Sequence, residues 1–213
     1  RASSHGAIAL QSPSIPAQTE FSMHWSNSQK RRMPMATLKT PINNSDHIRG
    51  PMTAVITLVE YGDYQCPHCG IAHPIVNQVQ EHFGNSLRFV FRHFPLTEAH
   101  PLAGIAAESA ECAGAAGLFW EMHDALFEHQ SALGIPTIFA IADGLGLPES
   151  SLRNALEAGQ YRTKVRNDFM GGVRSGVNGT PAFFINGVRH DGAYDFASLV
   201  SAIQLRLAAE SYV

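Results

Sequence analysis

Two cysteines stand three positions apart in the segment Cys66-Pro67-His68-Cys69, where the residue types indicate a chemistry most clearly. Thiols at this spacing lie within one helical turn, so they can form and break a disulfide. The segment follows an apolar, β-branched run and precedes a helical pattern. A thiol pair placed between a strand and a helix is typical of a redox centre.

The two thiols are predicted to have different roles. Cys66 lies near the free N–H groups and positive end of the following helix, which stabilise a thiolate, so we expect it to be the nucleophile. Cys69, one turn further and more buried, is expected to resolve the mixed disulfide by attacking Cys66. Pro67 suits the first helical turn, where its missing N–H costs nothing. A lowered pKa of Cys66 stabilises the reduced pair and makes the disulfide a better oxidant.

Two further residues are candidates for tuning this pair. His68 can hydrogen-bond to the Cys66 thiolate or pair with it electrostatically, although it could equally be an exposed turn histidine. Glu60 is the odd residue in an otherwise apolar run, six positions before Cys66. A buried carboxylate there could accept the Cys69 proton. Alternatively, Glu60 is the polar end of a strand at the sheet edge.

The cysteines also allow interpretations other than a redox pair. The pair could be half of a zinc site with His68 or His73, but a structural site needs four ligands and no second CxxC exists, so no metal is expected. Cys112 lies in an alanine-rich helical pattern and is predicted to be a small buried apolar residue.

The flanking segments predict a strand-helix-strand unit. Residues Ala54 to Tyr61 form a short apolar run typical of a central strand. A helix is expected from the cysteines to about Phe83, and a second strand over Leu87 to Arg92. Such a unit is right-handed with parallel strands, so the cysteines lie at the carboxyl end of the first strand.

The rest of the chain predicts a helical insertion of about residues 97–176, then a second set of elements. Asn186-Gly187 between two apolar runs indicates a tight hairpin. Asp195 suits the N-cap of a closing amphipathic helix. The expected order is therefore βαβ, helices, ββα.

Composition limits the function classes. The chain has 213 residues, 45% hydrophobic and 15% charged, which is typical of a globular protein. Residues 51–213 carry a net charge of −7 with Lys164 as their only lysine, so nucleic-acid binding is not expected. No stretch approaches the roughly 18 apolar residues of a membrane span, so membrane insertion is not expected either.

Residues 1–52 are predicted to be a flexible tail and lead-in, because residues 1–34 show no sustained period. We hypothesise that residues 1–34 are a processed remnant or an upstream extension. No secretory signal is visible, which favours the cytoplasm; a processed chain would instead suit the periplasm.

The CPHC segment, the βαβ unit and the Thr180-Pro181 pair before the hairpin make the chain resemble the bacterial DsbA-like disulfide oxidoreductases of the thioredoxin superfamily. The likeness covers about residues 53–208, and we expect a DsbA-like thioredoxin domain over residues 53–210. The segments Arg92-His93-Phe94-Pro95-Leu96 and Gly179-Thr180-Pro181 resemble the branch that includes thioredoxin-like domains appended to some sodium/proton antiporters.

The resemblance implies an α/β thioredoxin-like fold with a four-stranded mixed sheet, a helical cap and a cis bond before Pro181. Glu60 becomes a buried acid beneath the active site. Thr180, where DsbA has valine, faces the disulfide, and the backbone at Thr180 and Pro181 binds extended substrates.

The function that this resemblance implies is thiol-disulfide exchange with protein thiols or disulfides. It needs no cofactor beyond the redox-active cysteines, and the second redox partner is unidentified. Two alternatives stay open at the level of sequence. One is a cytoplasmic reductase or glutathione-type small-thiol enzyme, and the other is a non-catalytic metal- or protein-binding module.

Overall fold

The computed structural model describes residues 36–210, and the hypothesis about residues 1–34 therefore concerns a segment outside this description. The elements follow the predicted order, with one additional strand ahead of the first expected one. The strands are β1 (His47–Arg49), β2 (Ile56–Gly62), β3 (Leu87–His93), β4 (Ala182–Ile185) and β5 (Val188–His190). The α-helices are α1 (Pro67–Phe83), α2 (Ala103–Ala115), α3 (Phe119–Glu128), α4 (Ile135–Gly144), α5 (Glu149–Ala158), α6 (Arg162–Arg174) and α7 (Phe196–Glu210).

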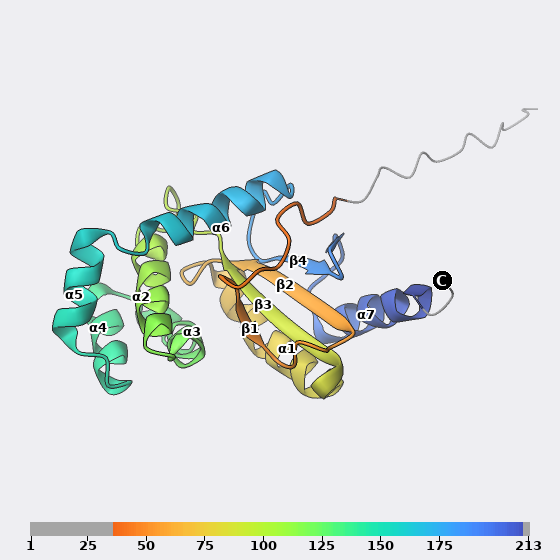
Figure 1. Cartoon of the computed structure of the whole chain (residues 1–213), viewed down its shortest axis with the longest axis horizontal. Coiled ribbons are helices and arrows are strands. Elements are labelled where there is room, and N and C mark those ends of the chain that lie inside the picture. Colours follow the sequence, from red (N-terminus) through yellow and green to blue (C-terminus); the bar gives the residue numbers. More distant parts are fainter. Residues whose placement is uncertain (1–35, 211–213) are drawn as a thin grey trace, which may run out of the picture. The chain divides into compact units, whose positions relative to one another are not determined.

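The strands form one mixed sheet in the order β1-β3-β2-β4-β5 (Figure 1). β2 and β3 are parallel, as the βαβ prediction requires, and α1 connects them. The remaining pairs are antiparallel. Strand β2, which leads to the cysteines, thus has a neighbour on each side and lies inside the sheet.

Five strands, rather than the predicted four, make up the sheet within the described residues. The additional strand, β1, pairs antiparallel with β3 and lies in the segment expected to be a lead-in. It is only three residues long and two of them, His47 and Arg49, are polar. Such a strand has no detectable period of its own and is defined by its partner.

The two faces of the sheet carry different helices (Figure 1). Alternate residues of a strand point to opposite faces. Leu58 packs in the apolar cluster that includes buried residues of α1 and α7. Val59 and Tyr61 pack on the other face, in the cluster that Phe169 of α6 covers. Glu60, two residues after Leu58, therefore faces the side of the sheet that carries α1.

The helical insertion has its predicted place between β3 and β4. Helix α2 contacts α3, α5 and α6, and α4 contacts α3 and α5. Helix α3 also contacts α1, so the insertion packs directly against the helix that begins at the cysteines. Cys112 of α2 is buried within this packing, as expected for a small apolar residue.

Local sequence signals are confirmed at the C-terminal end of the fold. Asn186 and Gly187 have φ angles of 46° and 77°, the left-handed conformation that a tight hairpin turn requires. Asp195 accepts a hydrogen bond from the Ser198 N–H at 3.0 Å, so it caps the start of α7.

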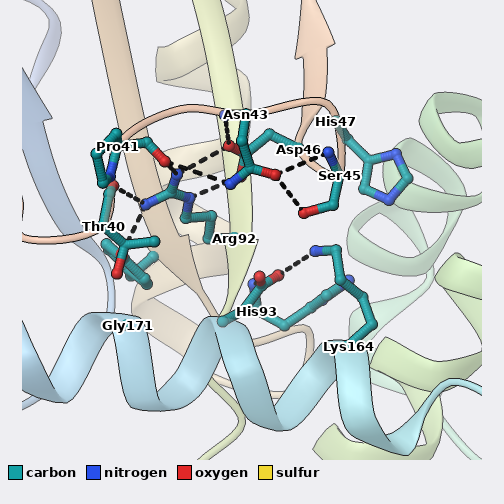
Figure 2. A network of polar contacts seen from close by, with 12 residues as sticks. Thr40, Pro41, Asn43, Ser45, Asp46, His47, Arg92, His93, Lys164 and Gly171 are labelled. Atoms are coloured by element: carbon teal, nitrogen blue, oxygen red, sulfur yellow. Dashed lines mark hydrogen bonds and ion pairs between the residues drawn. The ribbon is translucent and has the colours of Figure 1, made fainter.

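A buried arginine secures the lead-in to the sheet (Figure 2). Arg92 of β3 is 1% exposed. It donates to both carboxylate oxygens of Asp46 over 2.7 and 2.8 Å. Its other N–H groups donate to the Tyr61 hydroxyl and to the carbonyl oxygens of Thr40 and Pro41. Because every N–H of the guanidinium is used, this side chain fixes residues 40–46 against the sheet.

A second buried network joins the sheet to the insertion. Glu111 of α2 accepts hydrogen bonds from His47 Nε2 at 3.0 Å and His93 Nε2 at 2.9 Å. Burial opposes ionisation of Glu111, but the two histidine hydrogen bonds outweigh it and hold its pKa well below the usual value. Lys164 of α6 lies 3.4 Å from Glu111 and 2.6 Å from Asp168. The buried negative charges therefore have cationic partners.

None of the helices within residues 36–210 combines the length and the apolar character that crossing a membrane demands.

We expect Asp46→Asn to lower the free energy of unfolding by about 3–5 kcal/mol, because it leaves the buried Arg92 charge without its partner. Urea unfolding measures this loss. Glu149→Gln is the matched control: it breaks the exposed ion pair with Arg153 and should cost no more than about 1 kcal/mol. Equal losses in the two variants would contradict a structural role for residues 40–46.

Candidate active site

The cysteine pair lies at the start of α1, shortly after β2 ends. Cys66 is the N-cap of α1 and Pro67 the first helical residue, as predicted. The Cys66 carbonyl accepts hydrogen bonds from the N–H groups of Cys69 and Gly70 at 3.0 and 3.1 Å. Cys66 is 4% exposed and Cys69 is fully buried. The first thiol is thus the one that a partner can reach.

The pKa of Cys66 is lowered to about 5. A hydrogen bond from the Cys69 thiol is the largest cause, and it outweighs the opposing effect of burial. The backbone N–H groups of Cys69 and His68 lower the pKa further. At neutral pH, Cys66 is therefore a thiolate, the form that attacks a disulfide.

Cys69 has the opposite tendency. Burial raises its pKa well above the usual value, and its hydrogen bond to Cys66 and the charge of Glu60 add to this. Cys69 therefore remains a thiol at neutral pH. The two sulfurs therefore carry one proton between them at neutral pH: Cys69 holds it, and Cys66 is negatively charged.

Glu60 lies beneath the pair as a buried acid. It is 2% exposed, and its Oε1 has no hydrogen-bond partner among the described residues. Burial first, and then the negative charge of Cys66, raise its pKa to about 8. The alternative that Glu60 ends a strand at the sheet edge is wrong, because β2 pairs on both sides at this position.

The His68 ring does not make the expected hydrogen bond to Cys66. Its Nδ1 lies 3.0 Å from the hydroxyl of Tyr194, a residue just before α7. The ring is exposed, and Tyr194 is its hydrogen-bond partner. The residue acts on the thiolate through its backbone N–H, which the helix start provides regardless of the side chain.

Thr180 and Pro181 lie beside the outer thiol. The peptide bond between them is cis, as the resemblance implied. When Cys66 is protonated, its thiol donates to the Thr180 carbonyl oxygen over 3.4 Å. When Cys66 is a thiolate, a side-chain hydrogen bond from the buried Thr180 hydroxyl helps to lower its pKa. The loop before β4 thus forms one wall of the site.

Gln130 is a site residue that the sequence did not indicate. Its side-chain amide donates to the carbonyl oxygens of Tyr64 and Cys66, each at 2.9 Å. A Cβ on Gly70 would lie 2.2 Å from Gln130 Oε1, so the glycine makes room for this contact. Gln130 comes from the insertion, 64 residues along the chain from Cys66. No local sequence pattern predicts a contact between residues so far apart.

Asp63 fixes the loop between β2 and the cysteines. It is buried, and its Oδ1 accepts the Gln65 N–H at 2.7 Å. Its Oδ2 accepts the Leu96 N–H and lies 2.8 Å from His100 Nδ1. The approach to Cys66 is therefore held by side-chain contacts on both sides of the loop.

The zinc alternative needs His68 or His73 beside the thiols, and the structure places both elsewhere. His68 contacts Tyr194, and His73 lies near Asp124 of α3. Neither group of potential metal ligands within the described residues includes Cys66 or Cys69. The structure thus gives the thiols no third ligand.

Comparison with known proteins decides the family. Residues 43–205 match the family model described as thioredoxin. The chain belongs to the thioredoxin family. Its fold, with a helical insertion between β3 and β4, is DsbA-like.

Two solved structures show the fold of this thioredoxin-family chain. BdbD from Bacillus subtilis in its oxidised form matches with a TM-score of 0.73 and 21% identity, over 82% of this chain and 99% of that one. The thiol-disulfide exchange protein alpha-DsbA2 from Wolbachia pipientis matches with a TM-score of 0.67 and 20% identity, over 76% and 87%.

The relatives of higher identity are longer proteins, and this chain matches only a part of each. This thioredoxin-family chain is 44% identical over 167 residues to the Na(+)/H(+) antiporter NhaA 1 of Salinispora arenicola. The match covers 78% of this chain and 26% of the antiporter. The chain therefore spans about a quarter of the length of that relative.

The thiolate of the reduced DsbA-like domain should titrate with a midpoint near pH 5, followed by its ultraviolet absorbance. Cys66→Ser should remove this transition. Cys69→Ala should move the midpoint upward, because it removes the Cys69 hydrogen bond that is the largest cause of the shift. A midpoint near the ordinary thiol value of 9.0 in the unaltered domain would contradict this account.

Glu60→Gln should stabilise the reduced domain progressively as pH rises. The carboxyl has a pKa of about 8 when folded against a model value of 4.5, so ionisation favours unfolding through this window. We expect the variant to gain on the order of a few kcal/mol at pH 8 and little at pH 4.5. Urea unfolding at both pH values measures the difference.

Glu98→Gln, at an exposed position, is the control for Glu60→Gln and should show no such pH-dependent gain. An equal gain for Glu60→Gln at both pH values would show that the Glu60 carboxyl does not change charge on unfolding.

Proposed function

We propose that this protein is an enzyme that exchanges disulfides with protein thiols through its CPHC cysteines. The single observation that carries the proposal is the charge asymmetry of the pair. Cys66 has a pKa of about 5, whereas burial keeps Cys69 protonated. That difference suits one sulfur to attack or leave and the other to close the internal disulfide.

The exchange begins with a substrate thiolate that attacks Cys66 Sγ in the Cys66–Cys69 disulfide. The internal S–S bond breaks, and Cys69 leaves with the electron pair and takes up a proton. A second substrate thiolate then attacks the substrate sulfur of the mixed disulfide and releases the Cys66 thiolate. Two electrons pass from the substrate dithiol to the pair, and the reverse sequence reduces a substrate disulfide.

Glu60 is proposed to exchange the proton of Cys69. When Cys66 is bound in a mixed disulfide it carries no charge, so one of the two causes that raise the Glu60 pKa is absent. The pKa of Glu60 is then lower, so its deprotonated form is more populated at neutral pH. It can accept the Cys69 proton as that thiol attacks, directly or through one water.

The low pKa of Cys66 favours the oxidising direction. It stabilises the reduced pair and makes Cys66 a good leaving group when the substrate closes its own disulfide. We therefore propose that the pair takes electrons from protein dithiols, and that an unidentified redox partner reoxidises it.

The surroundings of Cys66 favour a polypeptide substrate over a small thiol. The Thr180-Pro181 loop leads directly into β4, so an extended segment can lie along it and use backbone hydrogen bonds. Ile71, two residues after Cys69, is 57% exposed and offers an apolar contact next to the thiols. Thr180 and Pro181 are accordingly proposed as substrate-binding residues.

Cys66→Ser should abolish oxidation of a dithiol peptide, because the Cys66–Cys69 disulfide that takes up the two electrons can no longer form. Cys69→Ser should instead hold a mixed disulfide when it is offered a peptide disulfide, since Cys66 attacks that disulfide, one peptide thiolate leaves, and the resolving thiol is missing; the adduct is detected by intact mass. Cys112→Ser is the control and should retain full activity. Activity that survives in Cys66→Ser would overturn the proposed function.

The direction of exchange has a separate measure. Equilibrating the Cys66/Cys69 pair against a glutathione buffer gives its potential, in which about 30 mV corresponds to 1.4 kcal/mol. A potential above that of glutathione supports the oxidising role. A potential well below it would make the protein a reductase while leaving the exchange chemistry intact.

A further inference from the structure

A cluster of three potential metal ligands joins α1 to the helical insertion. It consists of His73 of α1 and His123 and Asp124 of α3, and we call it the His-His-Asp cluster. One ligand atom from each residue lies within 4.8 Å of the other two. The thiol chemistry uses none of the three residues. The cluster is thus separate from the proposed function.

Few hydrogen-bond donors reach the potential ligand atoms of the cluster. Asp124 Oδ1 is buried without a hydrogen-bond partner. His73 Nε2 lies 3.7 Å from it, too far for a hydrogen bond. The side-chain amide of Asn77 reaches His73 Nε2 only at 3.4 Å. Three potential ligand atoms therefore lie close together, and one of them, Asp124 Oδ1, has no hydrogen-bond donor among the described residues.

The surrounding side chains hold these groups in place. His123 is 2% exposed, and its Nδ1 lies 3.1 Å from the Tyr64 hydroxyl, a contact that orients the ring. The His73 ring stacks on Phe127 with centroids 5.0 Å apart. Arg49 donates to Asp124 Oδ2 at 2.7 Å, which leaves Oδ1 for another partner.

The network around Glu111 provides a contrast within the same protein. His93, Glu111 and Asp168 also bring ligand atoms together. There, however, Lys164 lies 2.6 Å from Asp168 and 3.4 Å from Glu111, and His93 Nε2 hydrogen-bonds to Glu111 (Figure 2 shows Lys164 and His93). That network is closed by its lysine and by the histidine hydrogen bond. In the His-His-Asp cluster Arg49 occupies only Asp124 Oδ2, and Oδ1 has no hydrogen-bond partner among the described residues.

We propose that His73, His123 and Asp124 bind one divalent transition-metal ion, with Zn²⁺ as the reference ion. Two imidazoles and one carboxylate are a ligand set that zinc accepts, and three protein ligands leave a position for water. Zinc bonds to these atoms are about 2.0–2.2 Å long, so ligand atoms that lie up to 4.8 Å apart must move closer together when the ion binds. The Asp124 side chain is 31% exposed, which gives the ion a route in.

Such an ion would fasten α1, which begins at the redox cysteines, to α3 of the insertion. Its binding energy would add to the stability of the folded state, because the unfolded chain does not hold the three ligands together. The proposal therefore predicts a rise in melting temperature with zinc, independent of any thiol reaction.

The test uses the full chain with Cys66, Cys69 and Cys112 all changed to serine, so that no thiol can bind the metal. After chelator treatment, Zn²⁺ is titrated by calorimetry and melting is followed with and without Zn²⁺. We expect one zinc equivalent that depends on the cluster. His73→Asn and Asp124→Asn should each weaken it at least about tenfold, since loss of even an outer contact costs about 10–100-fold.

Two controls separate metal binding from a structural role. Arg49→Gln breaks the same ion pair as Asp124→Asn but keeps all three ligands, so it should bind zinc at least as tightly as the parent. His82→Asn removes an exposed histidine of the same helix and should leave binding unchanged.

Two outcomes would overturn the proposal. One is an absence of both binding heat and stabilisation at millimolar zinc, which would leave His73 and Asp124 as an ion pair only. The other is a zinc equivalent that persists in both His73→Asn and Asp124→Asn, which would assign it to other histidines.

Discussion

The structure depends on holding one negative sulfur at the start of α1. Burial alone would keep Cys66 protonated, and the thiol of Cys69 together with backbone N–H groups reverses that preference. Proline at the first helical position lets the helix begin directly after Cys66. Every other part of the site is arranged around a charge that the protein interior does not favour.

That charge has consequences for its neighbours. A second negative group close by is disfavoured, so Glu60 is driven towards its protonated form and Cys69 remains a thiol. The sheet makes this coupling possible, because the central position of β2 buries Glu60 on the face that carries α1. The central position of β2 therefore causes the burial of Glu60, and this burial raises the proton affinity of its carboxylate.

Local patterns were sufficient to predict most of the fold from the sequence. The CxxC segment, the Asn186-Gly187 turn and the Asp195 cap depend on neighbouring residues and appear where expected. Contacts between distant residues were missed. Strand β1 exists through its pairing with β3, and the partner of the His68 ring, Tyr194, lies 126 residues away. Single-sequence patterns contain no information about such pairings.

The contact between Gly70 and Gln130 has a consequence for how the two halves of the molecule can evolve. Any β-carbon at position 70 would collide with the Gln130 side chain, which spans from the insertion to the Cys66 carbonyl. A larger residue at position 70 would therefore push the terminal amide of Gln130 aside, and the carbonyl oxygens of Tyr64 and Cys66 would lose its two hydrogen bonds. An insertion exchanged between relatives would keep this support for the loop before α1 only where its residue at 130 suits the recipient's residue at 70.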